Sequence, residues 1–254
     1  LYQRGEWQTL AGWIDRLPEE VLTQEAALAL TRARLAAKFG QRQDCLARLD
    51  RVEAQPLDSE ERVRVDLYRG VAFRDLGRIG DAIDAYRRAR QAALEALPED
   101  HPVLAEIDLE EGVTIARAGQ FEAAQVRFET AALSFDRLKD YHRAAECRDC
   151  LGTTLYMRGQ LAPAMVEYTQ AQRSWRQLAD PQAQITTMNN MANVQHMLGE
   201  LDTARDTFDT VIQRASQIGS HRHEAWGKEG LATVERDLGR LDNAITLYTV
   251  AIHE

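Results

Sequence analysis

A short turn-like motif recurs along the chain at a nearly constant spacing. It reads Gly-x-apolar-x-x-Ala, and it begins at Gly77, Gly119, Gly159, Gly199 and Gly239. The last four of these glycines follow one another at steps of 40 residues, and the step from Gly77 to Gly119 is 42 residues. A fixed period of this size is typical of a solenoid, in which each repeat is one supersecondary unit that buries its apolar face against its neighbours.

The residues around each glycine indicate a pair of antiparallel helices. Glycine tolerates the left-handed conformation that ends a helix, and the alanine five residues later is small enough for two helices to approach closely. A small residue also stands seven positions before each glycine, and an aromatic residue stands nine positions after it. These alternations of small and large residues at helical spacing predict packed helical hairpins and an all-α fold. The small residues are Gly70, Gly112, Gly152, Ala192 and Ala232, and the aromatic residues are Tyr86, Phe128, Tyr168, Phe208 and Tyr248.

The unbroken period predicts one domain over residues 1–254. Residues 1–58 form atypical hairpins, and residues 59–254 form five regular repeats, of which the last is cut off in its second helix. We therefore expect a right-handed superhelix of about six to seven hairpins, supplied as a piece of a longer protein. The regular hairpins are expected at about 60–97, 103–138, 141–178, 181–218 and from 220 onward.

The first 58 residues keep the apolar pattern of helices but not the regular motif. Leu10, Trp13, Ile14 and Leu17 fall on one helical face, and Pro18-Glu-Glu is expected to start the next helix. A second hairpin is expected from Ala26 through Gly40 to Ala54, with Leu46 and Leu49 facing inward. Terminal repeats of a solenoid are often atypical in this way.

Charge and composition argue against several classes of partner. The formal net charge of the 254 residues is −9, whereas a dedicated nucleic-acid binder needs a basic surface. No run approaches the ~18 consecutive apolar residues of a membrane span, and no signal peptide is visible. Three cysteines in a chain of this length indicate a reducing compartment. We expect a cytoplasmic protein without direct nucleic-acid or membrane contact.

The sequence carries no motif of a known catalytic site. Phosphate-binding, dinucleotide-binding, metalloprotease and nucleophile-elbow patterns are all absent from it. Cys147-x-x-Cys150 has a metal-ligand spacing, but no second pair completes four ligands, so buried packing is the interpretation. His221-x-His223 is interpreted as a solvated helix start. We expect a protein that is not an enzyme and that needs no metal or cofactor.

The first helix of each pair is the expected binding element, because in a repeat superhelix these helices line the concave groove. The residues ten, six and three positions before each turn glycine share one helical face. Apart from Arg74, they are apolar in the first two regular repeats, and they are polar afterwards. Asparagine is a poor helix-interior residue, and its amide can both donate and accept hydrogen bonds to a peptide backbone or a sugar. The alternative is that these side chains bridge adjacent helices or face water. The predicted ligand- or partner-binding residues are Arg74, Arg117, Asp149, Thr153, Tyr156, Asn189, Asn193, His196, Trp226 and Arg236.

The pattern resembles the tetratricopeptide repeat, whose usual period is 34 residues. Versions with longer helices occur in kinesin light chains, in peptide-sensing bacterial regulators and in MalT-like transcriptional activators. The run Asn189-Asn190-Met-Ala192 is similar to the first two groups. The opening segment from Gly5-Glu-Trp7 to Pro18-Glu-Glu-Val21 resembles the start of the helical sensor region of MalT-like activators. In that family a nucleotide-binding switch domain precedes this region, and a DNA-binding domain lies at either end.

Two functions follow from the resemblance as expectations. The first is a non-catalytic sensor domain of a bacterial transcriptional regulator, which binds an effector or partner in the concave groove and acts on switch and DNA-binding domains outside this chain. The alternative is a stand-alone scaffold that docks a peptide segment of another protein. The sequence leaves open whether the ligand is a sugar, a peptide or a protein surface, and whether the chain forms a homo-oligomer.

Overall fold

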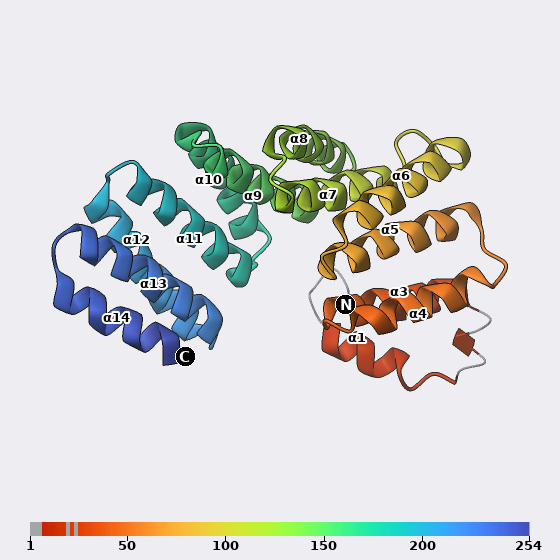
Figure 1. The fold of residues 1–254 in the computed structure, drawn as a ribbon, viewed down its shortest axis with the longest axis horizontal. Helices are drawn as coiled ribbons and strands as arrows, with labels where there is room; N and C mark the ends of the chain where they lie inside the picture. The colour runs from red at the N-terminus through yellow and green to blue at the C-terminus, as the bar shows by residue number, and fades with distance from the viewer. Residues whose placement is uncertain (1–6, 19–20, 23–24, 254) are drawn as a thin grey trace. The chain divides into compact units, whose positions relative to one another are not determined.

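The computed structural model describes residues 7–18, 21–22 and 25–253, and all regular secondary structure in these residues is helical (Figure 1). Among them, no helix is both long enough and apolar enough to span a membrane. The elements in chain order are α1 (Trp7–Ile14), α3 (Ala26–Lys38), α4 (Arg42–Glu53), α5 (Ser59–Asp75), α6 (Ile79–Ala96), α7 (Pro102–Arg117), α8 (Phe121–Arg137), α9 (Tyr141–Met157), α10 (Leu161–Gln177), α11 (Pro181–Met197), α12 (Leu201–Gln217), α13 (His221–Asp237) and α14 (Leu241–His253).

The chain divides into two compact units, and each is described by itself. Unit 1 comprises residues 1–134, from α1 to most of α8. Unit 2 comprises residues 135–254, from the end of α8 to α14. The expectation of one uninterrupted domain stays a prediction.

The predicted hairpins are confirmed. Every regular repeat consists of two helices that meet at the expected glycine, and the backbone there is left-handed, with φ between 72° at Gly159 and 79° at Gly199. The first helices of successive hairpins also contact one another. In unit 1 these are α3, α5 and α7, and in unit 2 they are α9, α11 and α13. We call each of these sets the first-helix layer of its unit.

The small-against-large pattern explains how each hairpin closes. Tyr86, Phe128, Tyr168 and Phe208 are at most 1% exposed. A Cβ atom added to Gly152 would lie 2.7 Å from the Tyr168 ring, so only a residue without a side chain fits there as the helices stand. Tight interdigitation of this kind is what makes a protein core sensitive to single methyl groups.

The aromatic side chains also join one hairpin to the next. A Cβ atom added to Gly230, on α13, would lie 2.3 Å from the ring of Phe208, on α12. Phe208 packs in one cluster with Ala192 of its own hairpin and with Leu231 and Val234 of the following one. The cores of the hairpins α11–α12 and α13–α14 are therefore continuous with each other.

The atypical beginning of the chain follows the predicted pattern only in part. Ile14 is buried, and Leu10 and Leu17 pack against the same small cluster. The prediction that Trp13 shares one apolar face with Leu10, Ile14 and Leu17 is wrong, because Trp13 is 57% exposed. It follows from helical geometry that a residue next to the buried Ile14 points about 100° away from it.

The second atypical hairpin is confirmed. Leu49 is fully buried and Leu46 packs against the core of unit 1, as expected. The predicted helix start at Pro18-Glu-Glu falls on residues 19–20, which lie outside the described residues.

Candidate functional site

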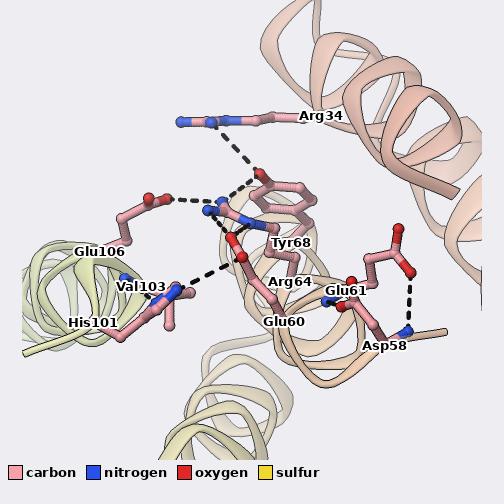
Figure 2. A network of polar contacts seen from close by, with 9 residues as sticks. All are labelled: Arg34, Asp58, Glu60, Glu61, Arg64, Tyr68, His101, Val103 and Glu106. Carbon is pink, nitrogen blue, oxygen red and sulfur yellow. Dashed lines mark hydrogen bonds and ion pairs between the residues drawn. The ribbon is translucent and has the colours of Figure 1, made fainter. Parts of the chain in front are cut away.

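Polar side chains tie the helices of the first-helix layer of unit 1 together (Figure 2). Arg64 of α5 donates hydrogen bonds to Glu60 at 2.7 Å, to the Tyr68 hydroxyl at 3.3 Å and to Glu106 of α7 at 3.5 Å. Arg34 of α3 donates to the same Tyr68 hydroxyl at 3.5 Å. Figure 2 shows these side chains converging from three helices, so the network crosses the whole layer.

A second network lies at the other end of α5 and contains two of the predicted binding residues. The Arg74 guanidinium donates to Glu110 of α7 at 2.5 Å and to Asp75 at 3.0 Å. Arg117 donates to the same Asp75 at 3.1 Å. The Arg74 side chain is only 9% exposed, whereas that of Arg117 is 55% exposed. Arg74 therefore bridges α5 and α7, while Arg117 keeps most of its surface in solvent.

Asp149 holds three helices of unit 2 together. Its carboxylate accepts a hydrogen bond from the Trp175 indole of α10 at 2.6 Å and from the Thr187 hydroxyl of α11 at 2.8 Å. Burial raises the pKa of Asp149 from its ordinary value of 3.8 to about 7, and the two hydrogen bonds oppose this shift. Asp149 is thus half-buried, with its carboxylate turned toward α10 and α11.

His196 and Arg236 meet at one carboxylate between α11 and α13. His196 Nε2 lies 2.8 Å from Oδ2 of Asp237, and Arg236 Nε donates to Oδ1 of Asp237 at 2.8 Å. Hydrogen bonds from Arg236 and His196 lower the pKa of Asp237. This exposed cluster joins the C-terminal ends of two neighbouring first helices.

The two asparagines of α11 form an amide pair on the layer. Asn193 Nδ2 donates to the backbone carbonyl of Asn189 at 3.1 Å. The side-chain oxygen of Asn189 is buried and has no hydrogen-bond partner among the described residues, and the same holds for Oε1 of Gln195. A buried acceptor without a partner costs about 1–3 kcal/mol. Satisfying this acceptor requires a rotation of the Asn189 amide or a donor that enters the layer, because the oxygen is covered as it stands.

The remaining predicted residues of unit 2 lie at the same layer. The Thr153 hydroxyl is 2.9 Å from the Tyr168 hydroxyl, and Tyr156 is partly exposed one turn further along α9. Trp226 on α13 is 42% exposed. The guanidinium of Arg222 lies 5.1 Å from the centroid of the Trp226 ring.

The predicted binding residues are divided between the two units. Arg74 and Arg117 lie in unit 1 and the other eight in unit 2. The expectation that the position ten residues before each turn glycine faces the groove is wrong for Leu67 and Leu109, which are 1% and 6% exposed. At this position the early repeats have apolar side chains that pack into the core.

The structure also shows where the histidine motif and the cysteine motif lie. The interpretation of His223 as solvated is wrong: it is 3% exposed, lies 2.9 Å from the Thr186 hydroxyl, and has a pKa lowered by burial and by Arg222. Cys147 is buried as expected, and burial raises the pKa of its thiol. Within the described part of the chain, no group of three potential metal ligands is assembled.

Sequence reasoning missed Trp175, Thr187 and Asp237 as members of this layer's polar contacts. A signal for two of them was present in the alignment of the repeats. Twelve positions before the turn glycine, Thr187 takes the place of Val65 and Ile107, and sixteen positions after it, Trp175 takes the place of alanine or phenylalanine. A polar side chain at a repeat position that is otherwise apolar indicates a polar contact with a neighbouring helix.

Residues 183–252 match the family model described as "Tetratricopeptide repeat". No curated protein sequence matches the chain. Several solved structures share its fold. A Rap protein complexed with Competence and Sporulation Factor aligns with a TM-score of 0.73 and 17% identity, over 99% of this chain and 75% of that one. NprR in complex with its cognate peptide NprX aligns with a TM-score of 0.69 and 16% identity, over 97% of this chain and 71% of that one.

A third structure with a similar fold belongs to a longer chain. It is a Signal Transduction ATPase with Numerous Domains from Pyrococcus horikoshii with a tetratricopeptide repeat sensor. The TM-score is 0.73 at 9% identity, over 89% of this chain and 38% of that one. At these identities the likeness is one of fold. The chain therefore carries tetratricopeptide repeats, matched directly over residues 183–252, and has the fold of tetratricopeptide-like solenoids.

Proposed function

We propose that the first-helix layer of unit 2, formed by α9, α11 and α13, binds an extended peptide segment of a partner protein and catalyses no reaction. The observation that carries this proposal is the amide pair on α11. Asn189 offers a buried acceptor without a partner, and Asn193 lies one turn further along the same helix. An amide side chain can hydrogen-bond both the N–H and the C=O groups of a peptide backbone.

The spacing of the two asparagines fits an extended chain. Residues four apart on a helix are separated by about 6 Å along its axis. Alternate residues of an extended strand are separated by about 6.7 Å. A peptide that runs along α11 can therefore meet Asn189 and Asn193 with successive backbone groups of the same orientation.

Aromatic surfaces on both sides of α11 suit the side chains of such a peptide. Tyr156 is partly exposed on α9, and Trp226 is 42% exposed on α13. Tyrosine and tryptophan are enriched at protein interfaces because they offer a large apolar surface with a polar tip. The structures of a Rap protein and of NprR, which have this fold, were solved with a bound factor and a bound peptide.

A sensor role in a transcriptional regulator is the finer form of this proposal. The likeness to a signal-transduction ATPase whose repeats are its sensor favours it. In that role the bound segment or effector would bias an adjoining nucleotide switch. A scaffold role uses the same surface without a switch. A phosphate-binding loop and a DNA-binding module elsewhere in the full open reading frame would support the sensor role, and their absence would support the scaffold.

Replacing Asn189 and Asn193 together by Ala is expected to weaken peptide binding about 5- to 140-fold, because two net hydrogen bonds of about 0.5–1.5 kcal/mol each are lost. The probe is a peptide selected from a random 12-residue library on the full chain, and its affinity is measured by calorimetry. Circular dichroism establishes that the double variant stays folded.

The matched control is Thr210→Ala, on α12. The Thr210 hydroxyl donates to the backbone carbonyl of Asp206 in its own helix. This variant should bind the selected peptide like the wild-type chain. Unchanged affinity in the folded Asn189→Ala, Asn193→Ala variant would show that the amide pair is not part of the binding surface.

A further inference from the structure

We infer that the side chain of Asp149 is a protonation-dependent latch between the hairpin α9–α10 and helix α11, which closes when the carboxyl group takes up a proton. The inference rests on the contacts of this one side chain. Trp175 Nε1 lies 2.6 Å from Oδ2, and the Thr187 hydroxyl lies 2.8 Å from Oδ1 and 2.9 Å from Oδ2. One carboxyl group therefore contacts polar groups from both neighbouring helices.

Counting donors and acceptors shows that the neutral acid can also be accommodated at this site. The Thr187 hydroxyl has one hydrogen, but it has three acceptors in reach: the two oxygens of Asp149 and the carbonyl of Ala183 at 3.0 Å. If Oδ1 of Asp149 carries a proton, it donates to Thr187, which donates in turn to Ala183. The Trp175 indole still donates to Oδ2. Every polar group of the cluster is then satisfied at once.

The ionised form has the same neighbours but no counter-charge. No lysine or arginine contacts Asp149 among the described residues. On α9 the nearest acid is Glu146, whose negative charge disfavours ionisation of Asp149, and on α10 the titratable group is the hydroxyl of Tyr168. Helix α11 offers only the neutral hydroxyl of Thr187. A buried charge that is not paired is costly, so the protonated form is favoured in the folded chain.

Comparison with the earlier repeats shows that this polar junction is specific to unit 2. The position of Asp149 is taken by Leu67 and Leu109 in the two preceding repeats, and the position of Thr187 by Val65 and Ile107. Those four side chains are at most 6% exposed. The junction of Leu67 with Ile107 has no group that titrates, and in the junction that follows, Leu109 is succeeded by Cys147, so Asp149 brings the first carboxyl group into this position.

The direction of the pH effect follows from burial. Burial raises the pKa of Asp149 from 3.8 to about 7. A carboxyl group whose pKa is raised on folding stabilises the fold at low pH, and this stabilisation is lost as the pH rises through the folded pKa. The free energy of unfolding should therefore fall steadily between about pH 4 and pH 7 and change little above pH 7.

This latch has a consequence for binding that rests on the proposed function. Helices α9 and α11 are two of the three helices of the proposed peptide surface, so their packing against each other determines the geometry of that surface. A peptide that needs the closed junction should bind more tightly at pH 6 than at pH 8. The stability of the junction can be measured without any peptide, so the two proposals fail separately.

The test is a pH series on the full chain, with Asp149→Asn as the variant that imitates the protonated acid. The indole N–H signal of Trp175, assigned with Trp175→Phe, should titrate in the wild-type chain with a midpoint at about pH 7. It should show no such transition in Asp149→Asn. The urea midpoint of the wild-type chain should fall from pH 6 to pH 8 relative to that of Asp149→Asn.

A second variant tests whether Asp149 or His142, the histidine that packs against Trp175, causes the transition of the Trp175 signal. The ring of His142 packs edge-on against Trp175 at 4.9 Å and lies 3.7 Å from Asp180. His142→Gln should keep the transition if Asp149 is its source. The latch is refuted if the Trp175 signal of the wild-type chain does not titrate between pH 5 and pH 8.5, or if the transition persists in Asp149→Asn and disappears in His142→Gln.

Discussion

Replacing Phe208 by Ala is expected to lower the free energy of unfolding of unit 2 by about 3–5 kcal/mol. The Phe208 side chain is 1% exposed and fills the space between α11, α12 and α13. Its ring lies so close to Gly230 that no side chain fits between them. Removing it leaves a cavity shared by two hairpins, which neither hairpin can close alone.

Urea unfolding followed by circular dichroism measures this effect. The matched control is Val166→Ala, on α10, because Val166 is 54% exposed and loses little contact when it is shortened. Its midpoint should be close to that of the wild-type chain. A loss for Phe208→Ala no larger than that for Val166→Ala would mean that the aromatic position does not hold successive repeats together.

Replacing Arg74 by Ala is expected to lower the free energy of unfolding of unit 1 by about 2–3 kcal/mol. The guanidinium is 9% exposed and is bonded to Glu110 and Asp75. Without it, the carboxylates of Asp75 and Glu110 lose the positive charge with which they are paired. Removal of one partner of a largely buried ion pair costs more than the pair itself contributes.

Arg87→Ala is the control for Arg74→Ala. Arg87 pairs with Asp84, but the two side chains are 72% and 58% exposed, so the pair is screened by solvent. Its loss should change the stability by no more than about 0.5 kcal/mol. If Arg74→Ala unfolds at the same urea concentration as Arg87→Ala, Arg74 is not a structural bridge and can serve a ligand instead.

The repeat architecture could be predicted from the sequence because it is encoded several times. Each turn glycine, with its alanine and its aromatic residue, shows the same packing pattern. A misassigned residue in one repeat can therefore be recognised by comparison with the other repeats. The bounds of α9 to α13 follow from this pattern. The N-terminal hairpins lack such redundancy, and the orientation of Trp13 was accordingly mispredicted.

The roles of individual polar side chains could be predicted only in part. The helical period places Asn189, Asn193 and His196 on one face, but it does not show which polar group has a partner on the next helix. Asp149 looks like its neighbours in a helical projection, yet its carboxylate is turned to Trp175 and Thr187. Such pairings depend on the distance between helices that are about 40 residues apart in the chain. The repeat period of the sequence does not determine that distance.

The most direct test of the proposed function maps a selected peptide onto the chain by the chemical shifts of its side-chain amide and indole groups. A peptide bound at the first-helix layer of unit 2 should shift the Nδ2 signals of Asn189 and Asn193 and the indole signal of Trp226. The same peptide should leave the amide signals of Gln170 on α10 unchanged. Shifts confined to α10, α12 and α14, with the signals of Asn189 and Asn193 unmoved, would contradict the assignment of this layer as the binding surface.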